Sequence, residues 1–177
     1  MRIGPVLIGY DGSEAAELAI VEAGALLPGR QALVIVVYKQ GLGLEVVQLP
    51  AVAAVGLPPA TLDVRTAMEV DRELAEHARR LSQEGAQVAA EAGFADPEGV
   101  AVADDVETPV AETIANVARE RHAQVVVVGG QGQSRVGEVL LGSITRDVIR
   151  RAPCPVLVVR QRVDDHALAG RPGAVAA

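Results

Sequence analysis

Four consecutive valines, Val125 to Val128, are the feature of this sequence that most constrains its fold. A strand with one face in water alternates apolar and polar residues, so an unbroken apolar run predicts a strand buried on both faces. The runs Val6 to Ile8 and Ala32 to Tyr38 have the same character. Strands of this kind belong to parallel sheets that carry helices on both faces, so the sequence predicts an α/β fold.

Helical patterns separate these apolar runs. An Ala-rich pattern follows Ser13, which is a suitable N-cap, and extends to Leu27 before a Pro-Gly stop. A longer pattern begins near Thr66, where Thr66 and Glu69 have the spacing of a capping box. The buried stripe expected of this second helix is Val70, Leu74, Leu81 and Val88.

The same alternation continues to residue 160. A weaker strand is expected over Val100 to Ala103, and Thr108 is expected to cap a helix whose first residue is a proline. A fourth helix is predicted over Ser143 to Arg151 and a fifth strand over Pro155 to Arg160. We expect one domain over residues 1–160, with a variable loop at 41–65 and a flexible tail over 161–177.

Composition excludes several classes of function. The net charge of −7 disfavours a nucleic-acid binder, which needs a basic face. The longest uncharged stretch, Val46 to Leu62, contains three prolines and a glycine, so no membrane helix is expected. The single cysteine, Cys154, cannot form an internal disulfide and indicates a cytoplasmic protein.

Glycine-rich loops follow the first and fourth predicted strands. If these strands are neighbours where the sheet reverses its winding, the loops Gly9 to Ser13 and Gly129 to Gly132 face one crevice. Glycine lets the backbone approach an anion closely, and successive amides form a nest for it. Gly142-Ser143 would add the N-terminus of a helix, so the loops predict a phosphate site. The alternative is that the glycines only shape tight connections.

Two known phosphate motifs do not match. A Walker loop needs a lysine, and the only lysine of the chain, Lys39, lies elsewhere. A dinucleotide fingerprint needs a third glycine where Arg135 stands, and it belongs after the first strand.

The loop after the fourth strand instead reads G-x2-G-x9-G-[ST], and its fixed places are Gly129, Gly132, Gly142 and Ser143. The sequence "ITRDVIRRAPCPVLVV" follows it, and "VLIGYDGS" stands near the start of the chain. With these motifs the chain resembles universal stress proteins of the ATP-binding type. The resemblance covers Val6 to Tyr38 and Val100 to Arg160.

This resemblance implies an open, Rossmann-like sheet of five parallel strands in the order 3-2-1-4-5, with ATP and Mg²⁺ across the crevice. Asp11 matches an aspartate beside the ribose and the metal-bound phosphates, although a charge at a helix N-terminus explains it equally well. Val37 matches the residue whose backbone reads the adenine edge, and Gly9 falls where the family often has proline. Gly129 matches a ribose contact. The phosphate contacts that the resemblance implies are Gly132, Gly142 and Ser143.

The chain also departs from the family pattern. Gly130 replaces a serine or threonine, Gln133 a basic residue, and Gln124 an aspartate. These changes are expected to weaken charge compensation around the phosphates. Arg135 is expected to restore a cation there.

The remaining polar residues give no catalytic assignment. There is no G-x-S-x-G elbow or catalytic carboxylate pair, and the three histidines, His77, His122 and His166, lack ligand spacing. Asp104-Asp105 is expected to be an exposed acidic loop. Tyr10 and Tyr38 are expected either to pack under a loop or to flank adenine.

Three functions remain open: a nucleotide-binding regulator that signals to an unidentified protein partner, a slow Mg-dependent ATPase, and a sensor of another adenine nucleotide or small ligand. Hydrolysis would also need a group that orients water, and the sequence offers none. The implied strand order puts Val156 to Val159 at the sheet edge, where unpaired amides favour association. We therefore expect a homodimer through this strand.

Overall fold

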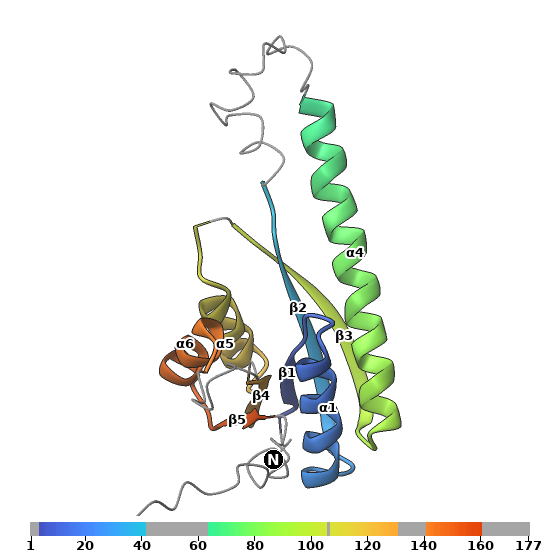
Figure 1. Ribbon diagram of the computed structural model, residues 1–177, viewed down its shortest axis with the longest axis vertical. Coiled ribbons are helices and arrows are strands. Elements are labelled where there is room, and N and C mark those ends of the chain that lie inside the picture. Colours follow the sequence, from blue (N-terminus) through green and yellow to red (C-terminus); the bar gives the residue numbers. More distant parts are fainter. Residues whose placement is uncertain (1–3, 42–63, 106, 131–140, 161–177) are drawn as a thin grey trace, which may run out of the picture.

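The computed structural model describes residues 4–41, 64–105, 107–130 and 141–160. They form one sheet of five parallel strands in the order β3-β2-β1-β4-β5 (Figure 1). This confirms the predicted fold class and places β1 beside β4 where the winding reverses. The strands are β1 (Val6–Gly9), β2 (Gln31–Lys39), β3 (Ala95–Asp104), β4 (Val125–Gly129) and β5 (Val156–Val159).

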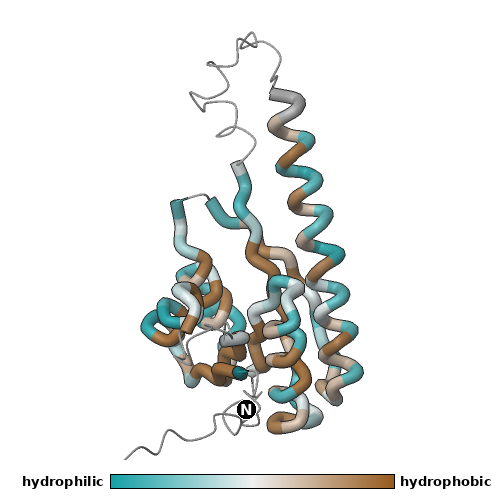
Figure 2. Tube along the Cα trace, viewed as in Figure 1, coloured by the Kyte–Doolittle hydropathy of each residue, from teal (hydrophilic) through white to brown (hydrophobic). Residues whose placement is uncertain are grey.

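Helices cover both faces of the sheet, as expected from its apolar strands. One face packs against α1 (Glu14–Leu26) and α4 (Val64–Glu91), and the other against α5 (Val110–Glu120) and α6 (Ser143–Arg151) (Figure 1). Each face has its own apolar core, and the hydrophobic residues concentrate in the strands between the helix layers (Figure 2). Within the ranges described here, no helix is long and apolar enough to cross a membrane.

The start of α1 agrees with its sequence. Ser13 is the N-cap, and its Oγ accepts a hydrogen bond from the Ala16 N–H at 3.2 Å. That bond satisfies one of the donors that a helix leaves free at its first turn.

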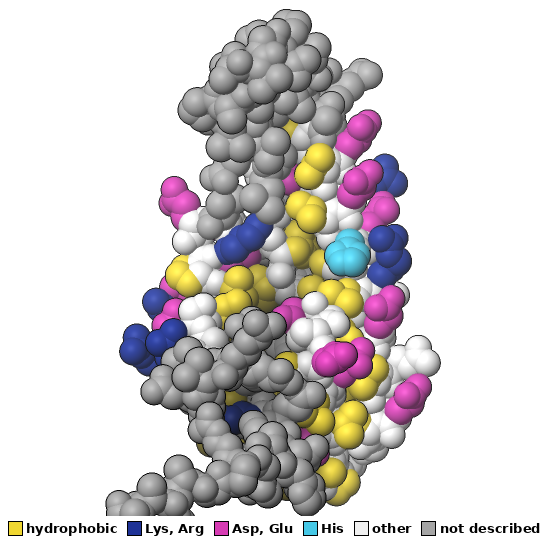
Figure 3. Space-filling view, viewed as in Figure 1, with side chains coloured by type: hydrophobic (Ala, Val, Ile, Leu, Met, Phe, Trp, Pro, Cys, Tyr) yellow, Lys and Arg dark blue, Asp and Glu magenta, His cyan; other side chains and the backbone are white. Residues whose placement is uncertain are grey.

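Two expectations about α4 are wrong, one about its capping box and one about the first residue of its buried stripe. The helix begins at Val64, so the Thr66–Glu69 capping box is wrong. Leu81 and Val88 pack against the core as predicted, and Leu74 is partly buried, but Val70 is 38% exposed. The reason is that α4 runs on past the strands that it covers (Figure 1), with acidic and basic side chains interspersed along its outer side (Figure 3).

Two boundaries near the end of β3 also differ from prediction. The strand is longer than Val100 to Ala103, because it pairs with β2 along its whole length, through a register shift between Gln31 and Leu33. Thr108 does not cap α5. The N-cap is Pro109, which has extended backbone angles and no side chain that can accept a hydrogen bond.

Candidate functional site

A cavity of about 690 Å³ opens at the carboxyl ends of β1 and β4. This is the point where an open parallel sheet forms its ligand crevice. Six of the eight residues expected at a binding site line it, and these six are Gly9, Asp11, Val37, Gly129, Gly142 and Ser143. The other two, Gly132 and Arg135, lie outside the described residues.

Two helix N-termini form the polar part of the cavity, and they differ in charge. The first turn of α1 carries two acidic residues, Glu14 and Glu17. The first turn of α6 carries none, and its N-cap, Gly142, has no side chain that could bond the free N–H groups. Both the helix dipole and these free donors favour an anion at the start of α6. An anion in the cavity is therefore expected near Gly142 and Ser143 rather than near α1.

Asp11 is exposed on the loop that enters α1, and part of its carboxylate is already engaged. Its Oδ1 accepts hydrogen bonds from the Ser13 N–H at 3.0 Å and the Ser13 Oγ–H at 2.6 Å. These bonds brace the turn at Gly12, whose φ of 77° favours glycine. Among the residues that the structure describes, no group of three or more His, Cys, Asp or Glu side chains could hold a metal ion. Asp11 can thus supply one ligand to a cation whose other ligands come from elsewhere.

The opposite part of the cavity is apolar. Its walls come from β2, β4 and α5, and the residues are Ile35, Val37, Val128, Val110 and Ile114. We call the space between Val37 and α5 the apolar slot. A flat, largely apolar group fits such walls, whereas a phosphate does not.

The backbone of Val37 is available to a ligand because β1 ends early. The last residue of β1 to pair with β2 is Gly9, opposite Ile35, and the Ile35 carbonyl then accepts the Tyr10 N–H at 2.9 Å. Backbone groups of alternate strand residues point to the same side. The N–H and C=O of Val37 therefore point to the side that β1 has left, along the cavity wall.

The two strand-end glycines play different parts. A Cβ on Gly129 would lie 2.7 Å from the Ala15 carbonyl oxygen, whereas a Cβ on Gly9 would lie 3.5 Å from the nearest atom, Val128 Cγ1. Gly129 is thus required because α1 packs closely on β4. For this glycine, the structural alternative to ligand binding is sufficient. Gly9 has room for a methyl group.

Thr145 is a site residue that the sequence reasoning missed. It is buried in the first turn of α6, and its Oγ1 donates to the Gly129 carbonyl at 3.1 Å. This bond fixes the start of α6 beside the end of β4, so it holds the anion-favouring helix terminus at the cavity. The available signal was a threonine two residues after Ser143, within the first turn of the predicted helix.

The effect expected of Gln124 on the charge around the phosphates is wrong. Gln124 lies at the amino end of β4, where its Oε1 accepts from Arg30 Nη2 and its N–H donates to the Pro5 carbonyl at 3.0 Å. The cavity is at the carboxyl end of this five-residue strand, and a strand of that length spans roughly 15 Å. Gln124 therefore does not affect charge compensation in the cavity.

Gly130 is buried and has little space for a side chain. Its N–H donates to the Val159 carbonyl at 2.7 Å, and an added Cβ would lie 3.2 Å from Arg160 Cγ and 3.3 Å from Val158 Cγ1. A serine or threonine here would require these neighbouring atoms of Val158 and Arg160 to move away slightly. Gln133 lies outside the described residues.

The tyrosines and histidines are not brought together into a reactive group. Tyr10 is buried at the cavity wall, and its hydroxyl donates to Glu17 Oε1 at 3.4 Å. Burial raises the pKa of Tyr10, and the negative charge of Glu17 adds to the shift. Tyr38 is partly buried and packs against the core on the face of the sheet that α1 and α4 cover. His77 and His122 are exposed on separate elements, and His166 lies outside the described residues.

Comparison with known proteins gives a consistent family. The model of the Universal stress protein family matches residues 3–160. Universal stress protein YxiE of Bacillus subtilis is 27% identical over 157 residues, which are 88% of this chain and 97% of that protein. Universal stress protein MJ0577 of Methanocaldococcus jannaschii is 35% identical over 51 residues, a match that covers 29% of this chain and only 32% of the relative.

Solved structures share the fold. The structure of MJ0577 has a TM-score of 0.65 at 22% identity and covers 93% of this chain and 100% of that one. A universal stress protein from Archaeoglobus fulgidus in complex with dAMP has a TM-score of 0.55 at 22% identity, covering 89% and 98%. A universal stress protein in complex with cAMP has a TM-score of 0.55 at 22% identity, covering 90% and 98%.

Proposed function

Because the chain belongs to the universal stress protein family, we propose that it is a regulatory protein that binds ATP in the cavity between β1 and β4. The observation that carries this proposal is the two-part lining, which has an apolar slot at one end and an uncapped helix N-terminus at the other. An adenine nucleotide has the same two parts. Two proteins with this fold hold dAMP and cAMP, which share the adenine and a phosphate.

In the proposed complex the adenine lies in the apolar slot, where the backbone of Val37 reads its polar edge. The phosphates lie against the first turn of α6 at Gly142 and Ser143, and Gly132 and Arg135 remain predicted contacts. Gly9 and Gly129 border the ribose at the strand ends. Asp11 would hold Mg²⁺ through one carboxylate, since this ion is commonly bound by one or two carboxylates together with phosphate oxygens. Bound Mg²⁺ would neutralise phosphate charge.

The regulatory role is favoured over hydrolysis by the polar groups of the cavity. Of the described acidic residues that line it, Asp11 is assigned to the Ser13 turn through Oδ1 and to Mg²⁺, and Glu14 belongs to the first turn of α1 rather than to the α6 terminus where phosphate is expected. Turnover needs a group that orients the attacking water at the terminal phosphate. We therefore propose that occupancy by ATP, rather than its hydrolysis, signals to a protein partner during stress.

The proposal extends to the domain and its location. Residues 1–160 act as one domain. The protein works in the cytoplasm, where Cys154 stays reduced. Burial raises the pKa of this thiol, which lowers the fraction of reactive thiolate.

Titration of the purified protein tests this function. We expect calorimetry to show binding of Mg-ATP and of adenosine, with bound ATP recovered intact by mass spectrometry after dissociation. Phosphate release as fast as nucleotide dissociation would instead identify an ATPase. Preferential recovery of another ligand from the purified protein would identify the sensor.

The variant Asp11→Asn separates the metal role from the helix-terminus role. Asparagine keeps an oxygen that accepts from Ser13, so the turn and the melting temperature should be preserved while the charge is lost. We expect the gain in ATP affinity on adding Mg²⁺ to fall by about fivefold or more, with adenosine affinity unchanged. An undiminished Mg²⁺ effect in the variant would remove Asp11 from the metal site.

We further propose that two copies of the chain join through β5. This strand ends the sheet, so one side of its backbone has no partner strand in the described structure, and Val156, Leu157 and Val158 are only partly buried. An apolar edge of this kind pairs readily with a second copy.

Val158→Asp is expected to convert this dimer to a monomer, because each copy would place a charge at the joined edge. Light scattering after size-exclusion chromatography measures the mass, and thermal melting shows that the variant is folded. The matched control is Val21→Asp, the same change at a side chain that is 50% exposed on α1. A folded Val158→Asp variant with the mass of the wild type would argue against this interface.

A further inference from the structure

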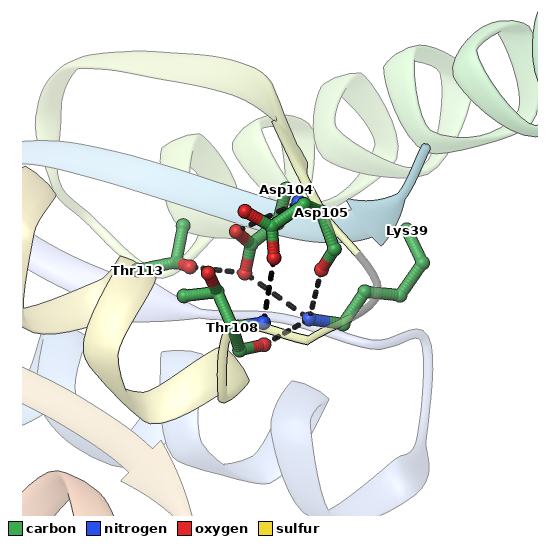
Figure 4. A network of polar contacts seen from close by, with 5 residues as sticks. All are labelled: Lys39, Asp104, Asp105, Thr108 and Thr113. Atoms are coloured by element: carbon green, nitrogen blue, oxygen red, sulfur yellow. Dashed lines mark hydrogen bonds and ion pairs between the residues drawn. The ribbon is translucent and has the colours of Figure 1, made fainter. Parts of the chain in front are cut away.

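The only lysine of the chain lies at the end of β2, where it joins three segments. Lys39 Nζ donates to Asp104 Oδ2 at 3.2 Å, to the Asp105 carbonyl at 2.8 Å and to the Thr108 carbonyl (Figure 4). An ammonium group has three N–H donors, and here each has an acceptor. We call the five residues of this network the Lys39 clamp, and they are Lys39, Asp104, Asp105, Thr108 and Thr113.

Asp104 is the centre of the clamp. Its side chain is only 9% exposed, and its Oδ2 accepts from both Lys39 and the Thr113 hydroxyl of α5. Asp105 is exposed, and its Oδ1 accepts the Thr108 N–H at 2.6 Å. Hydrogen bonding from the Thr108 side chain, and then from its N–H, lowers the pKa of Asp105. The expected exposed acidic loop is therefore wrong for Asp104 and right for Asp105.

The clamp lies beside the apolar slot. Strand side chains repeat with a period of two, so Lys39 is on the same face of β2 as Val37. On the other wall, Thr113 lies in α5 between Val110 and Ile114, the two slot residues of that helix. The clamp therefore connects the two walls that the proposed adenine would separate.

Among the described residues, the other side-chain attachment at the start of α5 is an exposed ion pair, in which Arg151 Nη1 of α6 lies 3.1 Å from Glu112 Oε2. The N-cap of α5, Pro109, makes no side-chain capping bond. Before α5, Thr108 is bound by both Lys39 and Asp105. Within the first turns of α5, the Thr113 hydroxyl donates to Asp104. A shift of the clamp would therefore move Val110 and Ile114 relative to β2.

We propose that the Lys39 clamp sets the width of the apolar slot and so determines how tightly the protein holds the base of a nucleotide. This rests on the proposed function, which puts the adenine in this slot. Lys39 and Asp104 are positioning residues that act through α5. Lys39 does not line the cavity, and its three donors are already used, so it takes no part in phosphate binding.

Two variants test this proposal at opposite ends of the central ion pair. Lys39→Met keeps most of the unbranched side chain without its donors, and Asp104→Asn keeps the shape without the charge. Calorimetry should show adenosine affinity lowered by about fivefold or more in each, and Mg-triphosphate affinity unchanged within about twofold. The control is Arg72→Met on α4, which breaks an exposed ion pair with Glu76 and should leave both affinities unchanged.

A second readout needs no ligand. Hydrogen exchange of the hydrogen-bonded backbone amides at the start of α5, residues 112–116, in the free protein should be faster in Lys39→Met and Asp104→Asn than in Arg72→Met. Unchanged exchange there, unchanged adenosine affinity, or equal losses for adenosine and triphosphate would each overturn the clamp as a positioning device. If the wild type binds neither ligand while exchange at 112–116 still responds, the proposed function fails and the clamp survives only as a support of α5.

Discussion

Gly129→Ala is expected to lower the affinity for Mg-ATP by about tenfold or more, which corresponds to about 1.4 kcal/mol. The added methyl group would lie 2.7 Å from the Ala15 carbonyl oxygen and 2.9 Å from its carbon. Both are main-chain atoms in the first turn of α1, so no side-chain rotation relieves the contact. Overpacking of this kind costs roughly 1–3 kcal/mol. The helix must shift, and the Asp11 turn that leads into it shifts as well.

Gly9→Ala is the matched control, because it adds the same methyl group at the end of the neighbouring strand. Its nearest neighbour would be Val128 Cγ1 at 3.5 Å, an ordinary van der Waals contact. Titration with Mg-ATP should therefore give an affinity within about twofold of the wild type, and melting of both variants reports the change in stability. Similar losses in the two variants would mean that crowding of the ligand, and not the position of α1, explains the effect of Gly129.

The strands and the location of the cavity could be predicted because each follows from a local pattern and a general rule. The valines of β4 and the apolar residues of β1 and β2 can be accommodated only in strands covered on both faces. Glycine loops after β1 and β4 then meet if those strands are neighbours. The resemblance predicted that they are neighbours, and the strand order confirms it. The sequence thus indicated which residues share a cavity.

The contacts that shape this cavity could not be predicted, because they join residues far apart in the chain. Asp104 meets Lys39 across 65 positions, and neither residue has a local signal for the other. Gly129 looked like a ligand contact, yet its missing side chain is explained by α1. Val70 fits the helical period but is exposed, because periodicity does not show where a helix extends beyond the sheet that it covers. Gln124 was misjudged because adjacency to a strand does not say which end faces the ligand.

Gly99→Val is expected to destabilise the fold strongly, because α4 packs closely against β3 at Gly99. A Cβ there would lie 2.2 Å from the Ser82 carbonyl oxygen and 2.6 Å from its carbon, both main-chain atoms of α4. The helix would have to lift from the sheet, and it contributes Ala78 and Ala89 to the core. We expect a loss of about 3 kcal/mol or more in the free energy of unfolding, measured by urea denaturation without nucleotide, and a melting temperature about 10 °C lower.

Ala103→Val is the control for Gly99→Val, since Ala103 lies on the same face of β3 but is exposed. A β-branched residue suits a strand there, so the stability of the Ala103→Val variant should be unchanged or slightly higher.

The two variants also test whether α4 supports the nucleotide site. Gly12, in the loop that carries Asp11, packs so closely on α4 that a Cβ would lie 2.9 Å from Leu81 Cδ1. Lifting α4 removes this support, so Gly99→Val should weaken Mg-ATP binding even where the protein remains folded. Wild-type affinity in a destabilised but folded Gly99→Val variant would show that the Asp11 turn is held by Ser13 alone.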